Sequence, residues 1–469
     1  MELNWQNAGG KLPEGWTVVP LRDFLVNEKS VSVGVMYPGK HDENGVPLIK
    51  VGDVKNGKIE GTPESRISSE VDEEYKRTRL SGDELLITLV GNPGECVIVQ
   101  PHMKGWNAAR ALAVLRLKNP DTRQWLNMVL QSRPLKHIID SRLNTTVQKT
   151  LNLKDVKELP IPIPDIGTDT FCRHYYDLER KITLNRQINQ TLEQMAQTLF
   201  KSWFVDFDPV IDNALDAGNP IPDELQQHAD ARKAVRESEG FKPLPNDVRQ
   251  LFPDAFEESE LGWVPKGWVV STVSDIAHIN SKSWSKKSAP EAVEYVDLSN
   301  AKNGVILDTD IYLFEEAPSR ARRILNKKDT IFGLVRPANR SFAFVDRDGL
   351  TGSTGFAVVK AKKSNCPSFI YQLLTSDNIV ELFIRIADGA AYPAIKPDDI
   401  ADVQFAMPNS EVLSHYEVVT NSYRERTGLG LTNNICLAKL RDTLLPKLIS
   451  GELRLDDVEA AVEQETVSA

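Results

Sequence analysis

Two groups of basic and amide side chains are the residues whose types and positions favour a binding chemistry. Lysine and arginine hold phosphate groups, while arginine, asparagine and glutamine at loop tips can also hydrogen-bond the edges of bases. For any single residue, an ordinary solvated surface position is the alternative. As DNA contacts we predict, in the N-terminal half, Lys76, Arg77, Arg79, Asn92, Arg110, Asn144 and Gln148, and, in the C-terminal half, Lys302, Arg320, Arg322, Arg323, Arg336, Asn339 and Arg340.

Motifs for catalysis are missing from the sequence. It has no glycine-rich dinucleotide fingerprint after a strand, no Walker A sequence and no Asp/Asn-Pro-Pro-aromatic stretch of an amino-methyltransferase. The run Asp206-Phe207-Asp208-Pro209 only superficially resembles that last motif. The seven histidines show no metal-ligand spacing. We therefore predict no catalytic, cofactor-binding or metal-binding residue, and favour a binding or scaffolding protein.

The charge distribution is compatible with DNA binding although the net charge is −10. Residues 211–262 hold 12 acidic and 5 basic side chains, and residues 452–469 hold 6 acidic and 1 basic. The rest of the chain is therefore slightly basic. Residues 102–160 have 11 lysines and arginines against 4 acidic residues. DNA binding depends on the local field rather than on the net charge.

Two long helices of one design are predicted from a repeated apolar stripe. The segment 183–204 has no proline or glycine, and its apolar residues recur every three or four positions. A second stripe lies near the C-terminus, and four of its leucines follow residues of the first at a constant offset of 245. Narrow stripes of this kind can bury each other as in a coiled coil, although each helix could instead pack on its own domain. The predicted packing residues are Leu184, Ile188, Leu192, Met195, Leu199, Leu437, Leu440, Leu444 and Leu448.

The blocks that precede the helices also repeat. Pro13-Glu14-Gly15-Trp16 and Pro265-Lys266-Gly267-Trp268 each open a block, and proline-containing strands near Pro164 and Pro408 end them. Strand and helix patterns recur between these points, whereas the turns differ. Divergent loops on a duplicated scaffold indicate two related binding tasks with different targets.

The predicted architecture is an α/β (α+β) chain with a pseudo-two-fold internal repeat. Two domains of mixed strands and short helices alternate with the two long helices. The predicted segments are a first domain over 1–165, a long helix over 166–210, an acidic spacer over 211–262, a second domain over 263–409, a second long helix over 410–455 and an acidic tail over 456–469.

Two further expectations concern irregular segments. Within the spacer we predict one short surface helix over Pro222–Ser238, with linker on either side. In the second long helix, Gly428 and Gly430 have no counterpart in the first, and the copy offset changes near them by about four residues. Helical glycine costs roughly 1 kcal/mol per residue, so the sequence predicts a local unwinding or break there.

The cellular setting is predicted from apolar runs and cysteines. No apolar run reaches the length of about 18 residues that a membrane span needs. The N-terminus has no signal-peptide pattern. The four cysteines are scattered singly, which indicates neither a zinc site nor a disulfide framework. A reducing cytoplasm is the simplest expectation.

With its two variable blocks, two matching helices and proline-rich exits over Val156–Pro164 and Val403–Pro408, the chain resembles the specificity subunit of Type I restriction–modification systems. The segment from Gln194 to Val205, with Trp203-Phe204, adds to the resemblance. It covers nearly the whole chain. It implies that each block is a target recognition domain for one half of a bipartite, asymmetric DNA site, and that the helices form an antiparallel pair that spaces the domains.

The resemblance also implies the partners. Two modification (methyltransferase) subunits and the restriction (motor and nuclease) subunits would join this chain on double-stranded DNA. S-adenosylmethionine, ATP and Mg²⁺ would belong to those partners, and this chain would bind no cofactor and catalyse no step. For subunit docking we predict the aromatic group Phe200, Trp203, Phe204 and Phe207. Its alternative is packing against the spacer. Alternatives for the whole chain are a coiled-coil adaptor that binds only proteins and a DNA-modifying enzyme fusion.

Overall fold

The computed structural model describes residues 4–10, 12, 14–55, 57–59, 61–143, 149–164, 168–306, 309–389 and 392–449. The chain forms two compact units, residues 1–184 with 432–469, and residues 185–431. Four predicted contacts lie outside the described residues or have side chains outside them, namely Asn144, Gln148, Leu444 and Leu448. The acidic tail lies outside them too.

The first unit is built on a four-stranded antiparallel sheet with the order β2-β10-β7-β8. A second sheet has the order β6-β3-β9, in which β3 and β9 are parallel, and β4 and β5 form a hairpin. The strands are β2 (Val31–Val33), β3 (Val46–Ile49), β4 (Val54–Lys55), β5 (Lys58–Ile59), β6 (Arg66–Ile67), β7 (Leu85–Thr88), β8 (Cys96–Ile98), β9 (Asn107–Ala108) and β10 (Leu112–Leu115).

The second unit repeats this topology. Its sheet β15-β24-β21-β22 has the same antiparallel order, and β16 and β23 repeat the parallel pair of β3 and β9. An added strand, β20, extends the sheet β19-β16-β23-β20. The strands are β15 (Ala277–Ile279), β16 (Ala292–Val296), β17 (Ala301–Lys302), β18 (Val305–Ile306), β19 (Asp310–Leu313), β20 (Ala321–Leu325), β21 (Thr330–Gly333), β22 (Phe342–Phe344), β23 (Leu350–Ser353) and β24 (Phe356–Ala361).

A two-stranded ribbon joins the beginning and end of each domain. In the first unit β1 (Thr17–Pro20) pairs with β11 (Pro160–Ile163), and in the second β14 (Val269–Thr272) pairs with β25 (Gln404–Met407). Proline fits β11 because each of these strands has only one neighbour. The ribbon returns each chain segment to the start of a long helix.

Three short helices follow the last strand of the main sheet in the same order in both units. They are α2 (Arg123–Leu130), α3 (Arg133–Arg142) and α4 (Leu153–Lys157) in the first unit, and α10 (Pro367–Thr375), α11 (Asp377–Ile386) and α12 (Pro397–Ala401) in the second. Two other helices differ in place, since α1 (Ser69–Glu74) lies between β6 and β7 and α9 (Val273–Ile276) lies between β14 and β15. Trp125 of α2 is fully buried, and its Nε1–H donates to the carbonyl of Pro162 at 2.9 Å. Phe369 of α10 is buried in the corresponding core of the second unit.

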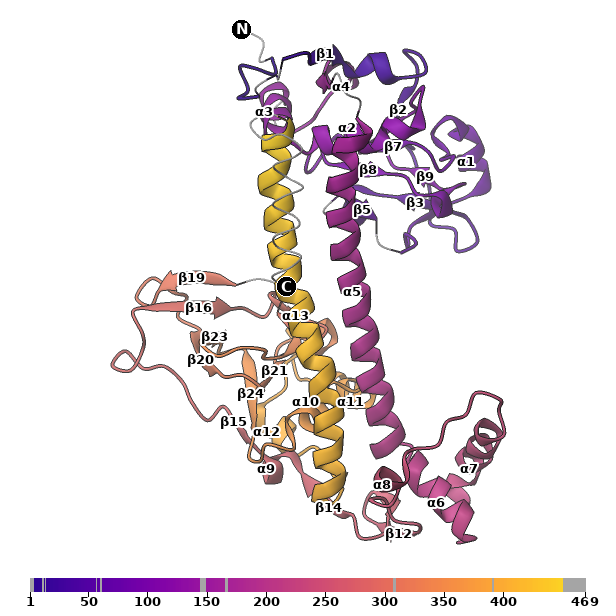
Figure 1. Cartoon of the computed structure of the whole chain (residues 1–469), viewed down its shortest axis with the longest axis vertical. Coiled ribbons are helices and arrows are strands. Elements are labelled where there is room, and N and C mark those ends of the chain that lie inside the picture. The colour runs from indigo at the N-terminus through magenta and orange to yellow at the C-terminus, as the bar shows by residue number, and fades with distance from the viewer. Residues whose placement is uncertain are drawn as a thin grey trace. The chain divides into compact units, whose positions relative to one another are not determined.

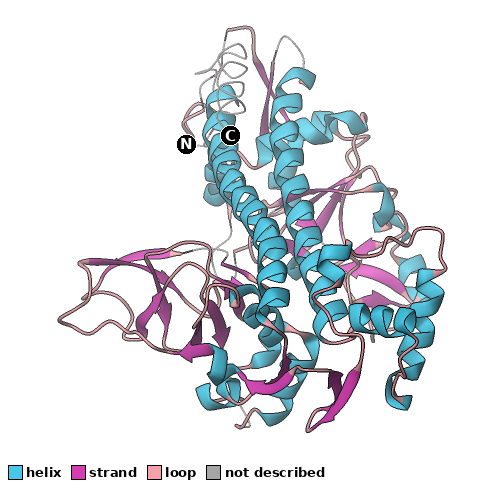
Figure 2. Ribbon diagram, turned by 60° about the horizontal axis from the view of Figure 1, so that its bottom comes forward, coloured by secondary structure: helices cyan, strands magenta, loops and turns pink. Residues whose placement is uncertain are grey.

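The long helices α5 (Asp169–Phe204) and α13 (Ser410–Ile449) lie side by side and antiparallel in each unit, as Figures 1 and 2 show. In the first unit Leu178 and Ile182 pack with Leu437. In the second, the side chain of Asn189 donates from Nδ2 to the carbonyl of Thr427 at 3.3 Å. Also in the second unit, the hydroxyl of Tyr416 donates to the carbonyl of Ala196 at 3.4 Å, so partner numbers fall along α13 as they rise along α5. The predicted antiparallel pairing is confirmed.

The predicted packing stripe is only partly right. Leu437 is buried, and Leu440 is half-buried against Leu178, Ile182 and Leu437. Ile188, Leu192 and Leu199 are half-buried, but Leu184 and Met195 are 53% and 45% exposed and are wrong as packing residues. We call the facing positions of α5 and α13 the seam. The middle of the seam is polar, so a search for apolar residues at helical spacing does not identify it. Its α5 positions are Leu178, Ile182, Asn189, Glu193, Ala196, Phe200 and Trp203.

The predicted break at Gly428 and Gly430 is also wrong, since α13 continues through both residues. Gly430 faces α5, where an added Cβ would lie 2.7 Å from Oδ1 and 3.1 Å from Nδ2 of Asn189. A Cβ at Gly428 would meet nothing within 4 Å. Gly430 therefore allows the close approach of the two helices at Asn189.

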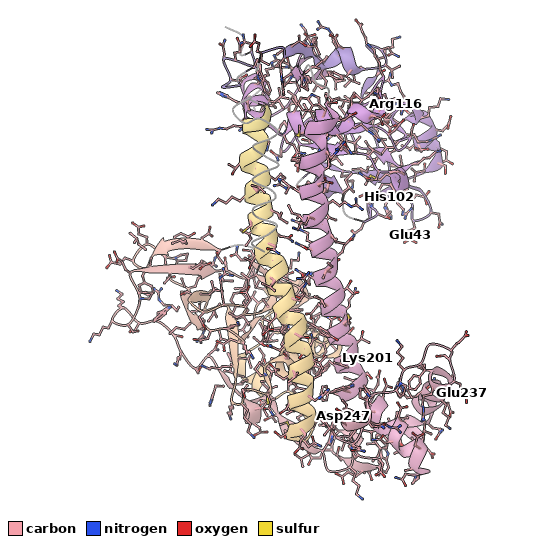
Figure 3. The ribbon with its side chains drawn as sticks, viewed as in Figure 1. Glu43, His102, Arg116, Lys201, Glu237 and Asp247 are labelled. Carbon is pink, nitrogen blue, oxygen red and sulfur yellow. The ribbon has the colours of Figure 1, made fainter. Side chains whose placement is uncertain are left out.

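The acidic spacer folds more fully than predicted. The expected helix is α7 (Asp223–Arg236), but its predicted linkers hold α6 (Asp208–Ala217), α8 (Asn246–Arg249) and the hairpin of β12 (Phe256–Ser259) and β13 (Gly262–Pro265). Asp212 of α6 binds Arg232 of α7 through two hydrogen bonds of 2.8 and 3.0 Å. Asp216 binds Arg236 and Arg249. Charged pairs therefore join α6 to α7 and α8, and the one buried residue of α7 is Ala229, so the hydrophobic pattern did not indicate this packing. Figure 3 shows Glu237, in the segment after α7.

No helix among the described residues is long and apolar enough to cross a membrane.

Candidate nucleic-acid interface

In the first unit, three predicted contacts lie on or next to the 3-10 turn η3 (Lys76–Thr78). A buried network fixes this turn, because Thr78 donates to Asn107 at 2.8 Å and Asn107 donates to Asp72 at 2.9 Å. Lys76 and Arg77 are exposed. The turn therefore presents two basic side chains on a rigid base.

Arg79 is a positioning residue for that turn. Its guanidinium binds the buried carboxylate of Asp72 at 2.5 Å and Glu73 at 3.0 Å, and the bond to Asp72 is the main reason that its pKa is raised. Arg116, seen in Figure 3, donates to the carbonyl of Arg79 at 2.8 Å. Two carboxylates already occupy Arg79, so it is less suited to phosphate than Lys76 or Arg77.

The two other described candidates lie in separate loops. Arg110 is exposed between β9 and β10, where its backbone N–H donates to the carbonyl of Val35 at 2.9 Å. Asn92 is exposed in the β7–β8 loop, and its Nδ2 lies 3.3 Å from Oε2 of Glu95. Glu95 also accepts the backbone N–H of Gly57 at 2.7 Å, which joins this loop to the turn between β4 and β5.

In the second unit, three predicted arginines lie in the edge strand β20 or directly before it. Arg320 binds Asp297 at 2.7 Å and Tyr295 at 3.1 Å, and the Tyr295 contact is the main cause of its raised pKa. Arg322 lies over the ring of Phe314 at 4.6 Å. Arg323 is half-buried, and burial lowers its pKa. Arg322 is the candidate best suited to a nucleic acid, because its stack leaves the edge of the guanidinium oriented.

A basic segment beside β20 was missed in the sequence. The backbone N–H of Trp284 donates to the carbonyl of Arg322 at 2.8 Å, and that of Ile324 to the carbonyl of Lys282 at 3.4 Å. Lys282, Lys286 and Lys287 are all exposed. A run of three lysines around one tryptophan was the available clue, since basic residues interleaved with an aromatic are typical of nucleic-acid surfaces.

The remaining candidates of the second unit lie at one loop cluster. Arg336, Asn339 and Arg340 belong to the β21–β22 loop around the 3-10 turn η6 (Pro337–Asn339). The neighbouring β17–β18 turn carries Lys302, and the N–H of Asn303 in that turn donates to the carbonyl of Arg340 at 3.1 Å. Arg340 binds Asp377 at 2.6 Å. The structure thus brings four predicted residues to one exposed end of the domain.

The aromatic group predicted for subunit docking is wrong as an exposed surface. Phe200, Trp203, Phe204 and Phe207 are at most 8% exposed and belong to the main core of the second unit. Phe204, for example, lies edge-on to Tyr416 of α13 with ring centroids 5.0 Å apart. The four rings close the helix pair onto the domain and the folded spacer, which is the alternative stated above.

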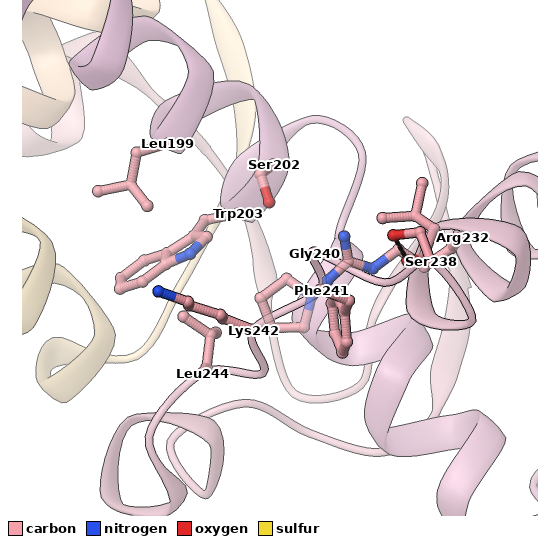
Figure 4. A pocket seen from close by; sticks show the side chains of 11 residues that line it. Leu199, Ser202, Trp203, Arg232, Ser238, Gly240, Phe241, Lys242 and Leu244 are labelled. Carbon is pink, nitrogen blue, oxygen red and sulfur yellow. Dashed lines mark hydrogen bonds between the residues drawn. The ribbon is translucent and has the colours of Figure 1, made fainter.

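A pocket of about 340 Å³ adjoins this aromatic group (Figure 4). Leu199 and Trp203 of α5 form one wall, and Phe241 and Lys242 line it from the segment after α7. The Arg232 guanidinium at its edge already binds Asp212 and lies 5.3 Å from the Phe241 ring centroid. Its charge therefore serves the packing of the spacer rather than an anionic ligand.

The described residues contain no group of three or more His, Cys, Asp or Glu side chains placed to hold a metal ion. What the arrangement offers chemically is hydrogen bonding and charge on two sets of loops.

Comparisons with known proteins agree with a duplicated, helix-paired recognition protein. Residues 13–194 match the family model described as the Type I restriction modification DNA specificity domain. The Type I restriction enzyme HindI specificity subunit of Haemophilus influenzae is 25% identical over 450 residues, which cover 88% of this chain and 96% of the relative. The EcoBI specificity subunit of Escherichia coli is 26% identical over 196 residues, or 39% of each chain.

The fold has a solved counterpart. The crystal structure of the Type I restriction–modification S subunit from M. genitalium superposes with a TM-score of 0.51 at 12% identity, covering 93% of this chain and 97% of that one. The fold is therefore a duplicated α+β domain in which each copy is followed by a long helix. Residues 13–194 match the Type I restriction modification DNA specificity domain, and the resemblance of the whole chain to Type I specificity subunits is confirmed.

Proposed function

We propose that this chain is the DNA sequence-specificity subunit of a Type I restriction–modification complex, in which each domain reads one half of a bipartite, asymmetric site. The proposal depends on one observation: the two domains share a strand topology but differ in the loops that the strands carry. The sheets β2-β10-β7-β8 and β15-β24-β21-β22 share their order, while the β7–β8 and β21–β22 loops differ in sequence and in charged residues. A scaffold that is kept while its loops change supports separate targets for each domain.

The test is an exchange of domains. Replacing residues 264–408 with the matching segment of another family member should change one half-site and leave the other intact. The readout is the methylated motif in the genome of cells that carry the chain with its partner subunits. A change in both half-sites would contradict independent reading, and the absence of any motif with the unaltered chain would contradict the function itself.

The partners belong to the same proposal. Two modification subunits and the restriction subunits assemble on this chain in the cytoplasm, and they supply S-adenosylmethionine, ATP and Mg²⁺ chemistry, while this chain binds no cofactor. The buried aromatic group leaves the outer faces of the helices as the docking surface. In the second unit Met195, Val418 and Leu429 are exposed there, and exposed apolar residues favour interfaces.

Docking can be tested with charge substitutions on these faces. Val418→Glu and Leu429→Glu together should reduce co-purification of the modification subunit while the thermal unfolding of this chain stays unchanged. Val269→Glu, an equally exposed apolar position on β14, is the matched control. Undiminished assembly in the double variant would show that the modification subunit docks on another surface. Purified alone, the chain should transfer no methyl group from S-adenosylmethionine to DNA.

A further inference from the structure

The β7–β8 and β21–β22 loops begin with the same backbone turn but with different residues. Val90 forms an isolated bridge with Thr150, and Val335 forms the corresponding bridge with Ala394. The residue after each valine has a positive φ, which is +87° at Gly91 and +51° at Arg336. Glycine adopts this conformation without strain, whereas a residue with a Cβ pays roughly 1 kcal/mol or more.

The strained backbone of Arg336 is held in place by its surroundings. Its N–H donates to the carbonyl of Pro393 at 2.7 Å, and its carbonyl accepts the N–H of Asn339 at 2.8 Å. Behind it, the N–H of Ile395 donates to the carbonyl of Leu334 at 2.9 Å. The equivalent turn in the first unit shows that glycine serves this backbone, so the arginine side chain needs a reason other than folding.

The side chain points to that reason, because the Arg336 guanidinium lies 4.7 Å from the ring centroid of Tyr392. Tyr392 is 69% exposed, which is unusual for a large aromatic residue in an otherwise well-packed domain. A stacked guanidinium keeps its planar fork of N–H donors oriented and loses less entropy when it binds. Two acceptors side by side, guanine O6 and N7, fit this fork in the major groove.

We propose that Arg336, oriented by the face of Tyr392, reads one guanine of the half-site bound by the second domain. The inference rests on the function proposed above. It adds the base that is read, the residue pair that reads it, and a difference between the two domains. The first domain has glycine at the equivalent position, so it cannot use this contact and reads its half-site by other loop residues. Arg340 binds Asp377 and acts as a positioning residue of the loop.

The experiment compares Arg336→Lys, Arg336→Gly and Tyr392→Leu, with Arg385→Lys on the exposed face of α11 as the matched control. Each chain is produced with its partner subunits, and the methylated motif of the host genome is determined together with the thermal unfolding of the chain. Arg336→Lys keeps the charge but loses the fork. One position of the second half-site, a G·C pair in the original motif, should then accept other base pairs, with discrimination reduced about tenfold to a hundredfold.

The other variants separate recognition from folding. Arg336→Gly should show the same relaxed position without any loss of thermal stability, because glycine relieves the positive φ. Tyr392→Leu should weaken discrimination at that same position, and the control should leave the motif unchanged. An unaltered motif with Arg336→Lys, or relaxation at an A·T pair, would overturn the inference while leaving the proposed function intact. A wild-type chain that directs no motif would instead remove the function.

Discussion

Gly428 and Gly430 lie two residues apart in α13, yet alanine at these positions should have opposite effects. At Gly428 the added Cβ meets nothing within 4 Å. The substitution therefore removes only the cost of a helical glycine, which is about 1 kcal/mol relative to alanine. For a unit of this size such a gain raises the midpoint of thermal unfolding by roughly 2–4 °C.

At Gly430 the same gain is offset by crowding in the seam. The Cβ would lie 2.7 Å from Oδ1 of Asn189. Overpacking of this kind costs about 1–3 kcal/mol. Displacing the amide also removes its bond to Thr427, and a hydrogen bond contributes about 1 kcal/mol. Gly430→Ala should therefore unfold at or below the wild-type temperature.

A third variant tests the cause. Asn189→Ala removes the side chain that the Cβ would meet, together with a buried Oδ1 that accepts no hydrogen bond among the described residues. In the Asn189→Ala background, Gly430→Ala should be stabilising by about the amount seen at Gly428. The assay is thermal and urea unfolding of the wild-type chain and the four variants. If Gly430→Ala alone stabilises as much as Gly428→Ala, close helix approach at Asn189 is refuted.

Three more outcomes are expected. Burial alone would raise the pKa of Glu179, but bonds from Lys58 and Arg441 hold it below its ordinary value. Its stabilisation is present above the ordinary carboxyl pKa and is lost as pH falls through the lowered one, so Glu179→Gln should unfold more easily in urea at pH 7 and the difference from wild type should shrink as the pH falls below the lowered pKa. An alkylating reagent should modify Cys436 first in mass spectra, because Cys96, Cys172 and Cys366 are buried; equal labelling would contradict the structure. Inserting four residues after Gln197 lengthens α5 by about 6 Å and should change the spacing tolerated between half-sites, whereas unchanged spacing would exclude a ruler role.

The internal repeat was predictable because equivalent elements of the two copies lie at a nearly constant offset in the sequence. Trp16 and Trp268 precede equivalent strands, and the α4 and α12 helices both lie just before a paired exit strand. Apolar periodicity identifies such elements whether or not their loops agree. The fold class could therefore be inferred from one sequence, and so could the existence of two long helices.

What the sequence did not reveal depends on polar partners that are distant along the chain. Glu193 lies in the seam with Arg424 at 3.9 Å and accepts a hydrogen bond from Gln372 at 3.0 Å. A search for apolar periodicity passes over a polar position such as Glu193 and selects apolar residues near it instead. Leu184 and Met195 were selected in this way. The folded spacer was missed for a related reason, because pairs such as Asp212–Arg232 join α6 to α7, a helix with one buried residue, Ala229.

The site residues were predictable by type but not by role. Arg79, Arg320 and Arg340 satisfy every sequence criterion for a DNA contact, yet each already binds a carboxylate of its own domain. Tyr392 satisfied none of these criteria, since its neighbours in the sequence do not indicate that its ring will be exposed beside Arg336. Local sequence identifies the donor groups, whereas the fold determines which of them bind carboxylates of their own domain.

Burying the polar groups of the seam costs free energy, which indicates that their role is to fix the register of α13 against α5 rather than to add stability. Arg424 lies over the rings of Phe344 and Tyr371, at 4.2 and 4.3 Å from their centroids, and its Nη2 donates to no described residue. Burying such a group costs more than burying an apolar side chain of the same volume, whereas a polar group in a helix pair restricts the pairings that leave it satisfied. Sliding α13 by one turn would remove Arg424 from Glu193 and Gly430 from Asn189 at once. Both features therefore favour a single alignment of the helices, and a chain that presents two sets of recognition loops requires such an alignment.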